Sequence, residues 1–424
     1  MVIYVADGTK NLTQIASEYG VPPSVVASDN GLSVSSPLAR GQALVIRFPR
    51  ELYTVKSGDT LFSVAARYGT NLNALYRNNP FLKGRPELRE GDLLAVSFET
   101  NQSFSFPLGG YAYPYISDDL LGTVLPFMNL FIPFTYGISL EGTLLPLDDE
   151  RLLSFARMYG VPAYMHLSTL TAGDVFDVSV AETVLSSAEK QDELITQVLQ
   201  NMRQKGYAGL DIDFEFLGKQ NSGRYAEFIS RARNRLNAEG FPVIVALAPK
   251  TSDDQKGELY EGHDYALIGE AADFVLLMTY EWGYTYGPPL AISPVPSVRR
   301  VIEYALTRIQ PQKIYLGISN YGYDWTLPYE KGVSPPAPSL STEEAFTLAL
   351  QTGSQIEYDT EAEAPFFVYQ KDGVQHEVWF EDARSIEAKL SLVPEYGLYG
   401  ALYWNLMRSN VSNLSLIASL IKGK

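Results

Sequence analysis

Three acidic residues alternate with apolar residues in the segment GYAGLDIDFEF, residues 206–216. Because the side chains of a β-strand point alternately to its two faces, Asp211, Asp213 and Glu215 share one face of a predicted strand. Successive acids then lie about 6.5–7 Å apart. Three carboxyl groups in a confined space do not all ionise easily, so one of them has a raised pKa. Such a carboxyl group suits general acid catalysis near neutral pH.

Two other structures fit the acidic alternation taken alone. An exposed antiparallel strand would place the three acids on a solvated face, and three carboxylates could also hold a divalent cation. The rest of the chain favours the catalytic interpretation. From about residue 104, eight apolar strand-like runs follow one another, and helical runs separate most of them.

This alternation predicts an α/β fold, a (β/α)8 TIM barrel over residues 104–424, with an open doubly wound sheet as the alternative. In a barrel the three acids point inward, and Glu215 lies near the C-terminal mouth, where active sites form. A stretch rich in proline and acidic residues, about 329–380, interrupts the alternation before the last strand. It contains two strand-like runs and is predicted to form a small α+β insertion on the rim of the barrel.

Two similar segments with a period of about 50 residues precede the predicted barrel. Gly8 corresponds to Gly58, Asn30 corresponds to Asn79, and GQALVI (41–46) corresponds to GDLLAV (91–96). Each segment is typical of a strand, two helices and a closing strand. The sequence therefore predicts two small α+β modules, at residues 1–48 and 51–98.

The composition limits the classes of partner. A net charge of −16 argues against a nucleic acid or an anionic membrane and favours a neutral or polyhydroxylated substrate. There is no cysteine, and the three histidines (His166, His263 and His376) show no metal-ligand spacing, so we expect structural or surface roles for them, no metal and no cofactor. No run of about 18 apolar residues predicts a membrane span, and no secretory signal is visible at the N-terminus.

The segment AGLDIDFE resembles the D-G-x-D-x-D-x-E signature of glycoside hydrolase family 18, the chitinase-like enzymes. The resemblance implies that Glu215 is the general acid and base, that Asp213 holds the substrate acetamide and stabilises an oxazolinium ion, and that Asp211 influences the Asp213 proton. The family uses no second carboxylate as nucleophile. Ala208 replaces the first aspartate of the signature, and we expect this change to tune pKa values.

Two further segments resemble the same family. LMTYEWG is similar to its sixth-strand segment and ALYWNL to its eighth-strand segment. This resemblance implies that Tyr280 donates a hydrogen bond to the acetamide oxygen and that Trp404 forms the apolar floor under the sugar. Met278 and Glu281 would line the sugar subsite, although the family usually has aspartate or asparagine where Glu281 stands.

The second module, YTVKSGDTLFSVAARYGT and its continuation, resembles a LysM domain, which binds N-acetylglucosamine-containing glycans. The resemblance implies glycan binding by Gly58, Asp59, Thr60 and Leu61, and by Asn79 with the loop that follows it. The first module is similar to the same family but has DGTKNL in place of the SGDTL pattern.

The whole chain is most similar to bacterial spore-cortex-lytic and spore-coat glycosidases. This resemblance implies a retaining, substrate-assisted N-acetylglucosaminidase that acts on spore cortex peptidoglycan at the boundary between coat and cortex. A chitinase and a non-catalytic glycan-binding spore-coat protein are the alternatives.

Overall fold

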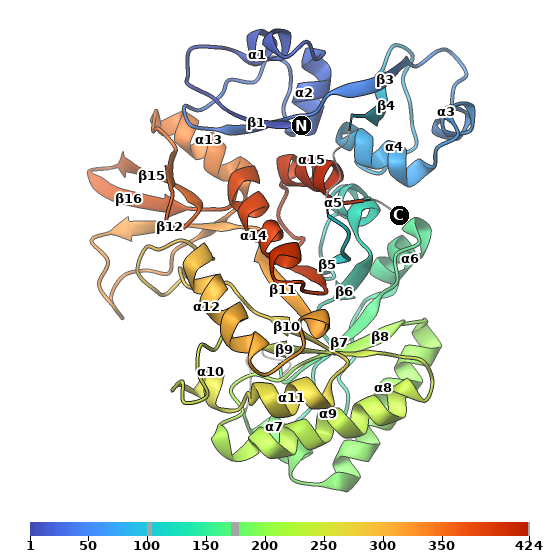
Figure 1. The fold of residues 1–424 in the computed structure, drawn as a ribbon, viewed down its shortest axis with the longest axis vertical. Coiled ribbons are helices and arrows are strands. Elements are labelled where there is room, and N and C mark those ends of the chain that lie inside the picture. The colour runs from blue at the N-terminus through green and yellow to red at the C-terminus, as the bar shows by residue number, and fades with distance from the viewer. Residues whose placement is uncertain (100–103, 171–177, 423–424) are drawn as a thin grey trace.

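The structure is a computed structural model that describes residues 1–99, 104–170 and 178–422. Its largest part is built around one eight-stranded sheet in the order β6-β5-β17-β11-β10-β9-β8-β7, in which every paired strand is parallel (Figure 1). The strands are β5 (Leu108–Ala112), β6 (Leu130–Pro133), β7 (Tyr164–Ser168), β8 (Gly209–Asp213), β9 (Val243–Leu247), β10 (Phe274–Leu277), β11 (Ile314–Ser319) and β17 (Gly400–Trp404).

The two outer strands of this sheet, β6 and β7, meet and close it into a barrel. Parallel bridges join Phe131 to Ala163 and Tyr136 to Leu167. The predicted (β/α)8 barrel is therefore confirmed, and the open doubly wound sheet is wrong. The strands of this barrel are buried along nearly their whole length, as expected when helices cover the outside and side chains fill the inside.

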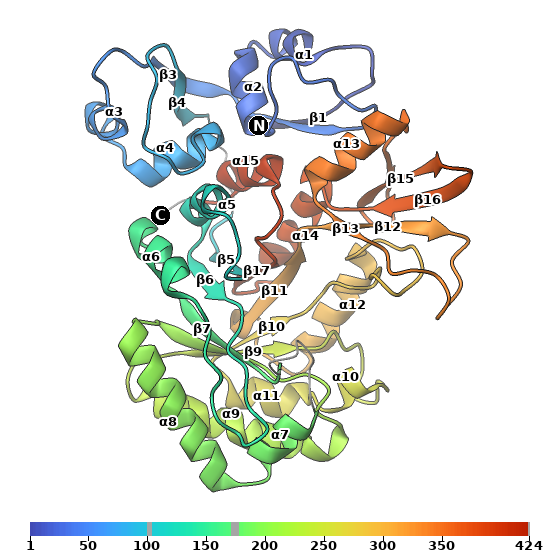
Figure 2. The ribbon, with the colours of Figure 1, turned by 180° about the vertical axis from the view of Figure 1, so that it is seen from behind.

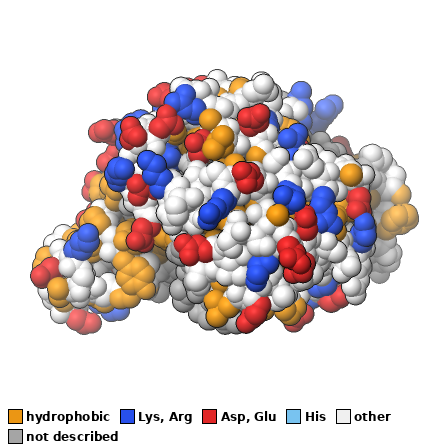
Figure 3. All heavy atoms as spheres, turned by 90° about the horizontal axis from the view of Figure 1, so that it is seen from below, with side chains coloured by type: hydrophobic (Ala, Val, Ile, Leu, Met, Phe, Trp, Pro, Cys, Tyr) orange, Lys and Arg blue, Asp and Glu red, His pale blue; other side chains and the backbone are white. Residues whose placement is uncertain are grey.

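Helices of the barrel pack around its outer surface (Figures 1 and 2). They are α5 (Asp118–Val124), α6 (Glu150–Tyr159), α7 (Val178–Leu185), α8 (Ala188–Lys205), α9 (Ser222–Asn237), α10 (Glu258–Glu261), α11 (Tyr265–Ala271), α12 (Val295–Leu306), α14 (Ala383–Glu395) and α15 (Val411–Leu420). Helix α8 illustrates how local sequence determines where these helices begin and end. Ser187 caps its first turn, and Gly206, with φ of 77°, ends it. On the face opposite the two small modules, acidic and basic side chains are interspersed (Figure 3).

The insertion forms a separate five-stranded antiparallel sheet in the order β13-β12-β16-β15-β14, with one helix. Its elements are β12 (Gly322–Leu327), β13 (Ser339–Leu340), α13 (Thr342–Thr352), β14 (Glu357–Asp359), β15 (Ala364–Lys371) and β16 (Val374–Trp379).

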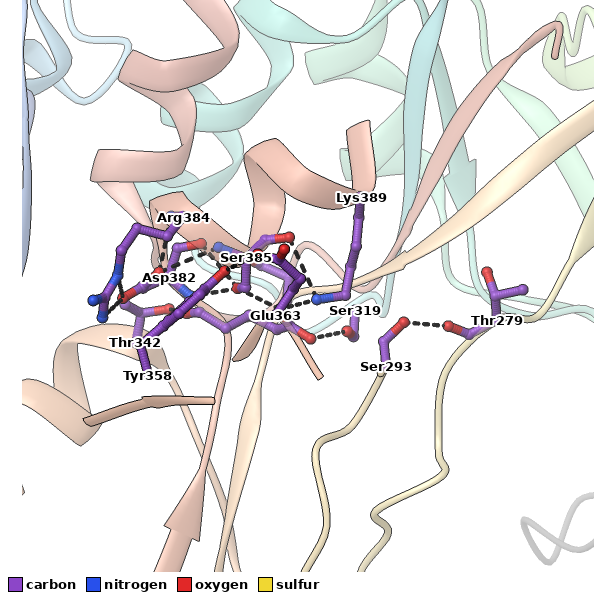
Figure 4. A network of polar contacts seen from close by, with 12 residues as sticks. Thr279, Ser293, Ser319, Thr342, Tyr358, Glu363, Asp382, Arg384, Ser385 and Lys389 are labelled. Carbon is purple, nitrogen blue, oxygen red and sulfur yellow. Dashed lines mark hydrogen bonds and ion pairs between the residues drawn. The ribbon is translucent and has the colours of Figure 1, made fainter. Parts of the chain in front are cut away.

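A buried ion pair connects the insertion to the barrel. Glu381, which follows β16, lies 2.7 Å from the ammonium group of Lys389 on α14, and both side chains are 1% exposed. Ser319, at the end of β11, donates a hydrogen bond of 2.8 Å to the same carboxylate, and Ser385 donates another of 2.5 Å. Figure 4 shows Ser319 of the barrel strand and Ser385 and Lys389 of α14 in this network. Because a buried charge is tolerated when it is paired and hydrogen-bonded, this network fixes the end of the insertion against the barrel.

The two N-terminal modules share one architecture, as the repeat predicts. The first contains β1 (Val2–Val5), α1 (Leu12–Glu18), α2 (Pro23–Asp29) and β2 (Ala43–Ile46), and the second contains β3 (Pro49–Thr54), α3 (Leu61–Tyr68), α4 (Leu72–Asn78) and β4 (Leu93–Phe98). Asn30 bonds the backbone of Val26 and Val45, and Asn79 bonds the backbone of Leu75 and Ala95 in the same pattern. The paired asparagines thus join the end of the second helix to the closing strand in both modules.

Both modules contact the barrel part of the chain directly. Tyr159 on α6 donates a hydrogen bond of 3.0 Å to the carbonyl of Gly84, and the amide of Ile356, in the insertion between α13 and β14, donates one of 2.8 Å to the carbonyl of Arg40. Figures 1 and 2 show both modules on the same side of the barrel, next to α15 and α13. Within the described residues, no helix combines the length and the apolar character that a membrane crossing requires.

Candidate active site

Strand β8 brings the three predicted acids to the inside of the barrel. Asp211 is fully buried, Asp213 is 6% exposed, and Glu215 is half-buried just beyond the C-terminal end of the strand. Burial raises the pKa of Asp213 to about 7 and the pKa of Asp211 well above its usual value. Burial and the nearby charge of Asp213 raise the pKa of Glu215 well above its usual value. A carboxyl group with a raised pKa therefore lies at the barrel mouth, as a general acid requires.

The inner acids have two polar neighbours that the sequence analysis did not assign to the site. Tyr111 on β5 donates a hydrogen bond of 2.8 Å to Oδ2 of Asp211. His166 on β7 places Nε2 3.7 Å from an oxygen of Asp211 and 3.7 Å from an oxygen of Asp213. The remaining oxygen, Oδ1, of each aspartate is buried and has no hydrogen-bond partner among the described residues.

His166 is held as a neutral ring. Its Nδ1 lies 2.6 Å from the hydroxyl of Thr135, and burial lowers the pKa of the imidazole to about 3. A neutral imidazole supplies no positive charge to stabilise ionised carboxylates, so the cluster favours a retained proton. We had expected a structural or surface role for His166. The feature that could have predicted its position beside the acids is the strand register, because the β7–β8 pairing aligns His166 with Asp211.

Tyr280 and Glu281 follow the C-terminal end of strand β10 and line the same cavity as Glu215. Tyr280 is buried, and burial together with the charges of Asp213 and Glu215 raises the pKa of its phenol well above the usual value, so it remains a hydrogen-bond donor. Glu281 accepts hydrogen bonds from the hydroxyls of Tyr321 and Tyr323. Burial nevertheless raises the pKa of Glu281. Met278, the third residue predicted here, packs against the apolar cluster that contains Tyr280.

Trp404 ends strand β17, which lies four strands from β8 in either direction around the barrel. Its ring packs against Phe134 at 4.9 Å, Tyr111 at 5.6 Å and Tyr113 at 6.1 Å between centroids. The indole is partly exposed. An aromatic surface therefore lies across the mouth from the acidic strand, where it can support the apolar face of a sugar.

A cavity of about 460 Å³ opens beside Glu215 in the sector of strands β8, β9 and β10. Met278, Tyr280 and Glu281 line it together with residues of the loop after β9 and of helix α12. Trp404 is not part of its lining. Among residues 1–99, 104–170 and 178–422, no three His, Asp or Glu side chains are arranged to hold a metal ion.

The glycan-binding residues predicted in the second module mostly shape its local structure. Thr60 caps α3, Leu61 is buried in the module core, and Asp59 accepts hydrogen bonds from the Tyr53 hydroxyl and the Lys56 amide. Gly58 adopts φ of 84°, and nothing would contact a Cβ there within 4 Å.

Asn79 is 2% exposed. Its side-chain amide donates hydrogen bonds to the carbonyls of Leu75 and Ala95 and accepts one from the backbone amide of Ala95. Glycan binding by this set stays a prediction. The exposed turn at Gly58 and the loop after Asn79 are the parts that could contact a sugar.

Comparison with known proteins agrees with this architecture. The model of the family "Glycosyl hydrolases family 18" matches residues 178–408, and that of the LysM domain matches residues 11–47 and 53–97. The chain therefore belongs to glycosyl hydrolases family 18 and carries two LysM domains.

Similar proteins include the cortical fragment-lytic enzyme of Bacillus anthracis, 34% identical over 92% of both chains. That of Bacillus subtilis (strain 168) is 40% identical over 69% of this chain and 68% of the relative. The crystal structure of the Bacillus cereus spore cortex-lytic enzyme SleL matches with a TM-score of 0.83 and 33% identity, over 100% of this chain and 98% of the other.

Proposed function

We propose that this protein hydrolyses the glycosidic bond of an N-acetylglucosamine residue in spore cortex peptidoglycan, with retention of configuration and with Glu215 as the general acid and base. The observation that carries the proposal is the position of Glu215 at the barrel mouth, with a pKa raised by burial and by Asp213. The similarity to cortical fragment-lytic enzymes over nearly the full chain supports the substrate class.

In the first step, Glu215 gives its proton to the glycosidic oxygen as the bond from the anomeric carbon to that oxygen breaks. The carbonyl oxygen of the substrate's own 2-acetamido group forms a bond to the anomeric carbon, which yields a cyclic oxazolinium ion. In the second step, the Glu215 carboxylate takes a proton from a water molecule whose oxygen attacks the anomeric carbon. The oxazolinium ring opens, and Glu215 is protonated again.

The inner acids position and stabilise this intermediate. The unpartnered Oδ1 of Asp213 can accept the acetamide N–H, and the Asp213 carboxylate stabilises the positive charge of the oxazolinium ion. Asp211, with Tyr111 and His166 around it, determines how readily Asp213 keeps its proton. The Tyr280 hydroxyl donates to the acetamide oxygen, and Trp404 supports the sugar ring from below.

The two LysM domains bind the same glycan outside the barrel, through the turn at Gly58 and the loop after Asn79 in the second module. A spore location, at the boundary between coat and cortex, agrees with the relatives, which are cortex-lytic enzymes.

The test compares the wild-type protein with Glu215→Gln on purified cortex fragments, with products identified by mass spectrometry. We expect loss of at least about a thousandfold in kcat for Glu215→Gln, because both steps need its proton transfer. Asp192→Asn, an exposed surface carboxylate on α8, is the matched control and should retain wild-type turnover. NMR of the first product should show the retained anomer. Normal hydrolysis by Glu215→Gln, or an inverted first product, would refute the mechanism.

A further inference from the structure

An exposed, positively charged side chain borders the cavity beside Glu215. Arg300 lines this cavity together with Glu215, Tyr280 and Glu281. Within the described parts of the chain, no carboxylate oxygen lies within 4.0 Å of its guanidinium group. A guanidinium group that shares a cavity with the general acid is placed to contact the part of a substrate that lies next to the scissile bond.

Helix α12 orients this arginine. Ser297 and Arg300 are three residues apart, so they lie on the same face of the helix, and both line the cavity. Nη2 of Arg300 donates a hydrogen bond of 2.9 Å to the hydroxyl of Ser297, which is itself 9% exposed. This bond uses one of the five guanidinium N–H groups and leaves the others available to a ligand.

The neighbouring arginine on the same helix shows the contrast. Arg299 points to α14, where it forms an ion pair with Glu395 and donates a hydrogen bond of 3.0 Å to the hydroxyl of Tyr396. Arg299 therefore has a carboxylate partner within the protein, whereas Arg300 is exposed and lines the cavity. The two residues form a natural pair of test and control positions.

The chemistry of the cavity favours one class of ligand. A guanidinium fork matches a carboxylate in shape and charge. In peptidoglycan, alternate sugars carry a 3-O-lactyl group whose carboxyl group is either free or joined to a stem peptide that bears carboxylates of its own. A chitin strand has no such group. In a chain with a net charge of −16, an arginine at the edge of this cavity also reduces the repulsion that such a substrate meets.

We propose that Arg300 binds a carboxylate of the peptidoglycan strand next to the scissile bond and thereby selects peptidoglycan over neutral N-acetylglucosamine polymers. This inference rests on the proposed function, because it assumes that the scissile bond lies at Glu215. The carboxylate comes either from the lactyl group or from the stem peptide, and both sources present the same chemistry to the guanidinium group.

The experiment measures binding in the Glu215→Gln background by isothermal titration calorimetry, with and without Arg300→Gln. Three ligands are compared: chitotetraose, a peptidoglycan tetrasaccharide with free lactyl carboxylates, and the same tetrasaccharide with stem peptides. We expect Arg300→Gln to weaken binding of at least one carboxylate ligand about tenfold or more, and to change chitotetraose binding less than about twofold. The ligand that loses affinity identifies the carboxylate. Raised salt should reduce the same affinity in the Arg300 protein.

Arg299→Gln in the same background is the control and should leave the order of the three affinities unchanged. Equal weakening of all three ligands by Arg300→Gln, an unchanged affinity for both carboxylate ligands, or no binding of either to the Arg300 protein would overturn the inference. Mass spectrometry of the mixtures keeps this result separate from the proposed function. Cleavage of a ligand by the Glu215→Gln protein would refute the role of Glu215, whatever the dependence on Arg300.

Discussion

Replacing Asp213 by asparagine should lower the pKa of Glu215 and move the basic limb of the pH–rate profile to lower pH. Glu215 must be protonated to act as an acid, so activity falls as pH rises through its pKa. The charge of Asp213 opposes ionisation of Glu215 at pH values above about 7, where Asp213 is itself ionised. Asparagine removes that charge, keeps the shape, and so makes ionisation of Glu215 easier.

The expected size follows from the strand geometry. Residues two apart on a strand lie about 6.6 Å from each other. With an effective dielectric constant of about 20, two unit charges at that separation interact by about 2.5 kcal/mol, which corresponds to just under two pH units. Asp211 is two residues further from Glu215, at about 13 Å, and burial raises its own pKa, so Asp211→Asn should move the same limb by less than Asp213→Asn does and by at most about one pH unit.

The assay is kcat/KM against pH on soluble cortex fragments, because this ratio reports ionisation in the free enzyme. The assay uses enough protein to follow the low residual activity that we expect of Asp213→Asn. A titration of the Glu215 carboxyl carbon by ¹³C NMR gives the same pKa without turnover. The reasoning is refuted if the limb stays in place or moves to higher pH in a folded Asp213→Asn protein, or if the two asparagine variants shift it equally.

Three further outcomes can be measured. Burial raises the pKa of Asp211, so ionisation of Asp211 destabilises the folded protein. This destabilisation is absent below the unfolded pKa of about 4 and grows as pH rises toward the folded pKa. Calorimetry should therefore show Asp211→Asn melting above the wild type at pH 8 but not at pH 4, and the reverse order would contradict this. Lys389→Met leaves Glu381 charged and buried, so denaturant unfolding should show a loss of about 3–5 kcal/mol, and a loss below about 1 kcal/mol would show that the pair is dispensable. Ala208→Asp adds a carboxylate about 23 Å from Glu215 along the chain, so the basic limb of its pH–rate profile should move by about half a pH unit at most, and a larger shift would show stronger coupling than distance predicts.

Local pattern predicted much of the barrel because each strand carries its own signal. Runs such as PVIVALAPK became β9, and the acidic alternation became β8, since burial on both faces of a parallel strand requires a short apolar segment. One run was less simple. KIYLGISNYGY appears as a single strand in the sequence, but the structure divides it between β11 and β12. The second half pairs with β16, where Tyr323 lies opposite Trp379, and such a distant partner leaves no local mark.

The surroundings of the acids were harder to predict for the same reason. The alternation in β8 identifies Asp213 and Glu215 as inward-facing, but it does not reveal which side chains reach them from other strands. Tyr111 is 100 residues from Asp211 in the sequence and yet donates a hydrogen bond to it. His166 lacks any metal-ligand spacing, and only the strand register places it beside both aspartates.

The direct contacts between the LysM domains and the barrel have a consequence for how a polymer would be processed. The carbonyl of Gly84 accepts a hydrogen bond from Tyr159 on a barrel helix, and that of Arg40 accepts one from Ile356 in the insertion, so both domains pack directly on the rest of the chain. For modules joined by a flexible tether, effective concentration depends on tether length. Here it depends on whether the glycan itself is long and stiff enough to span the two sites. The LysM domains would then add affinity only for glycan strands above a threshold length. The protein would therefore bind a long polymer more tightly than a short fragment.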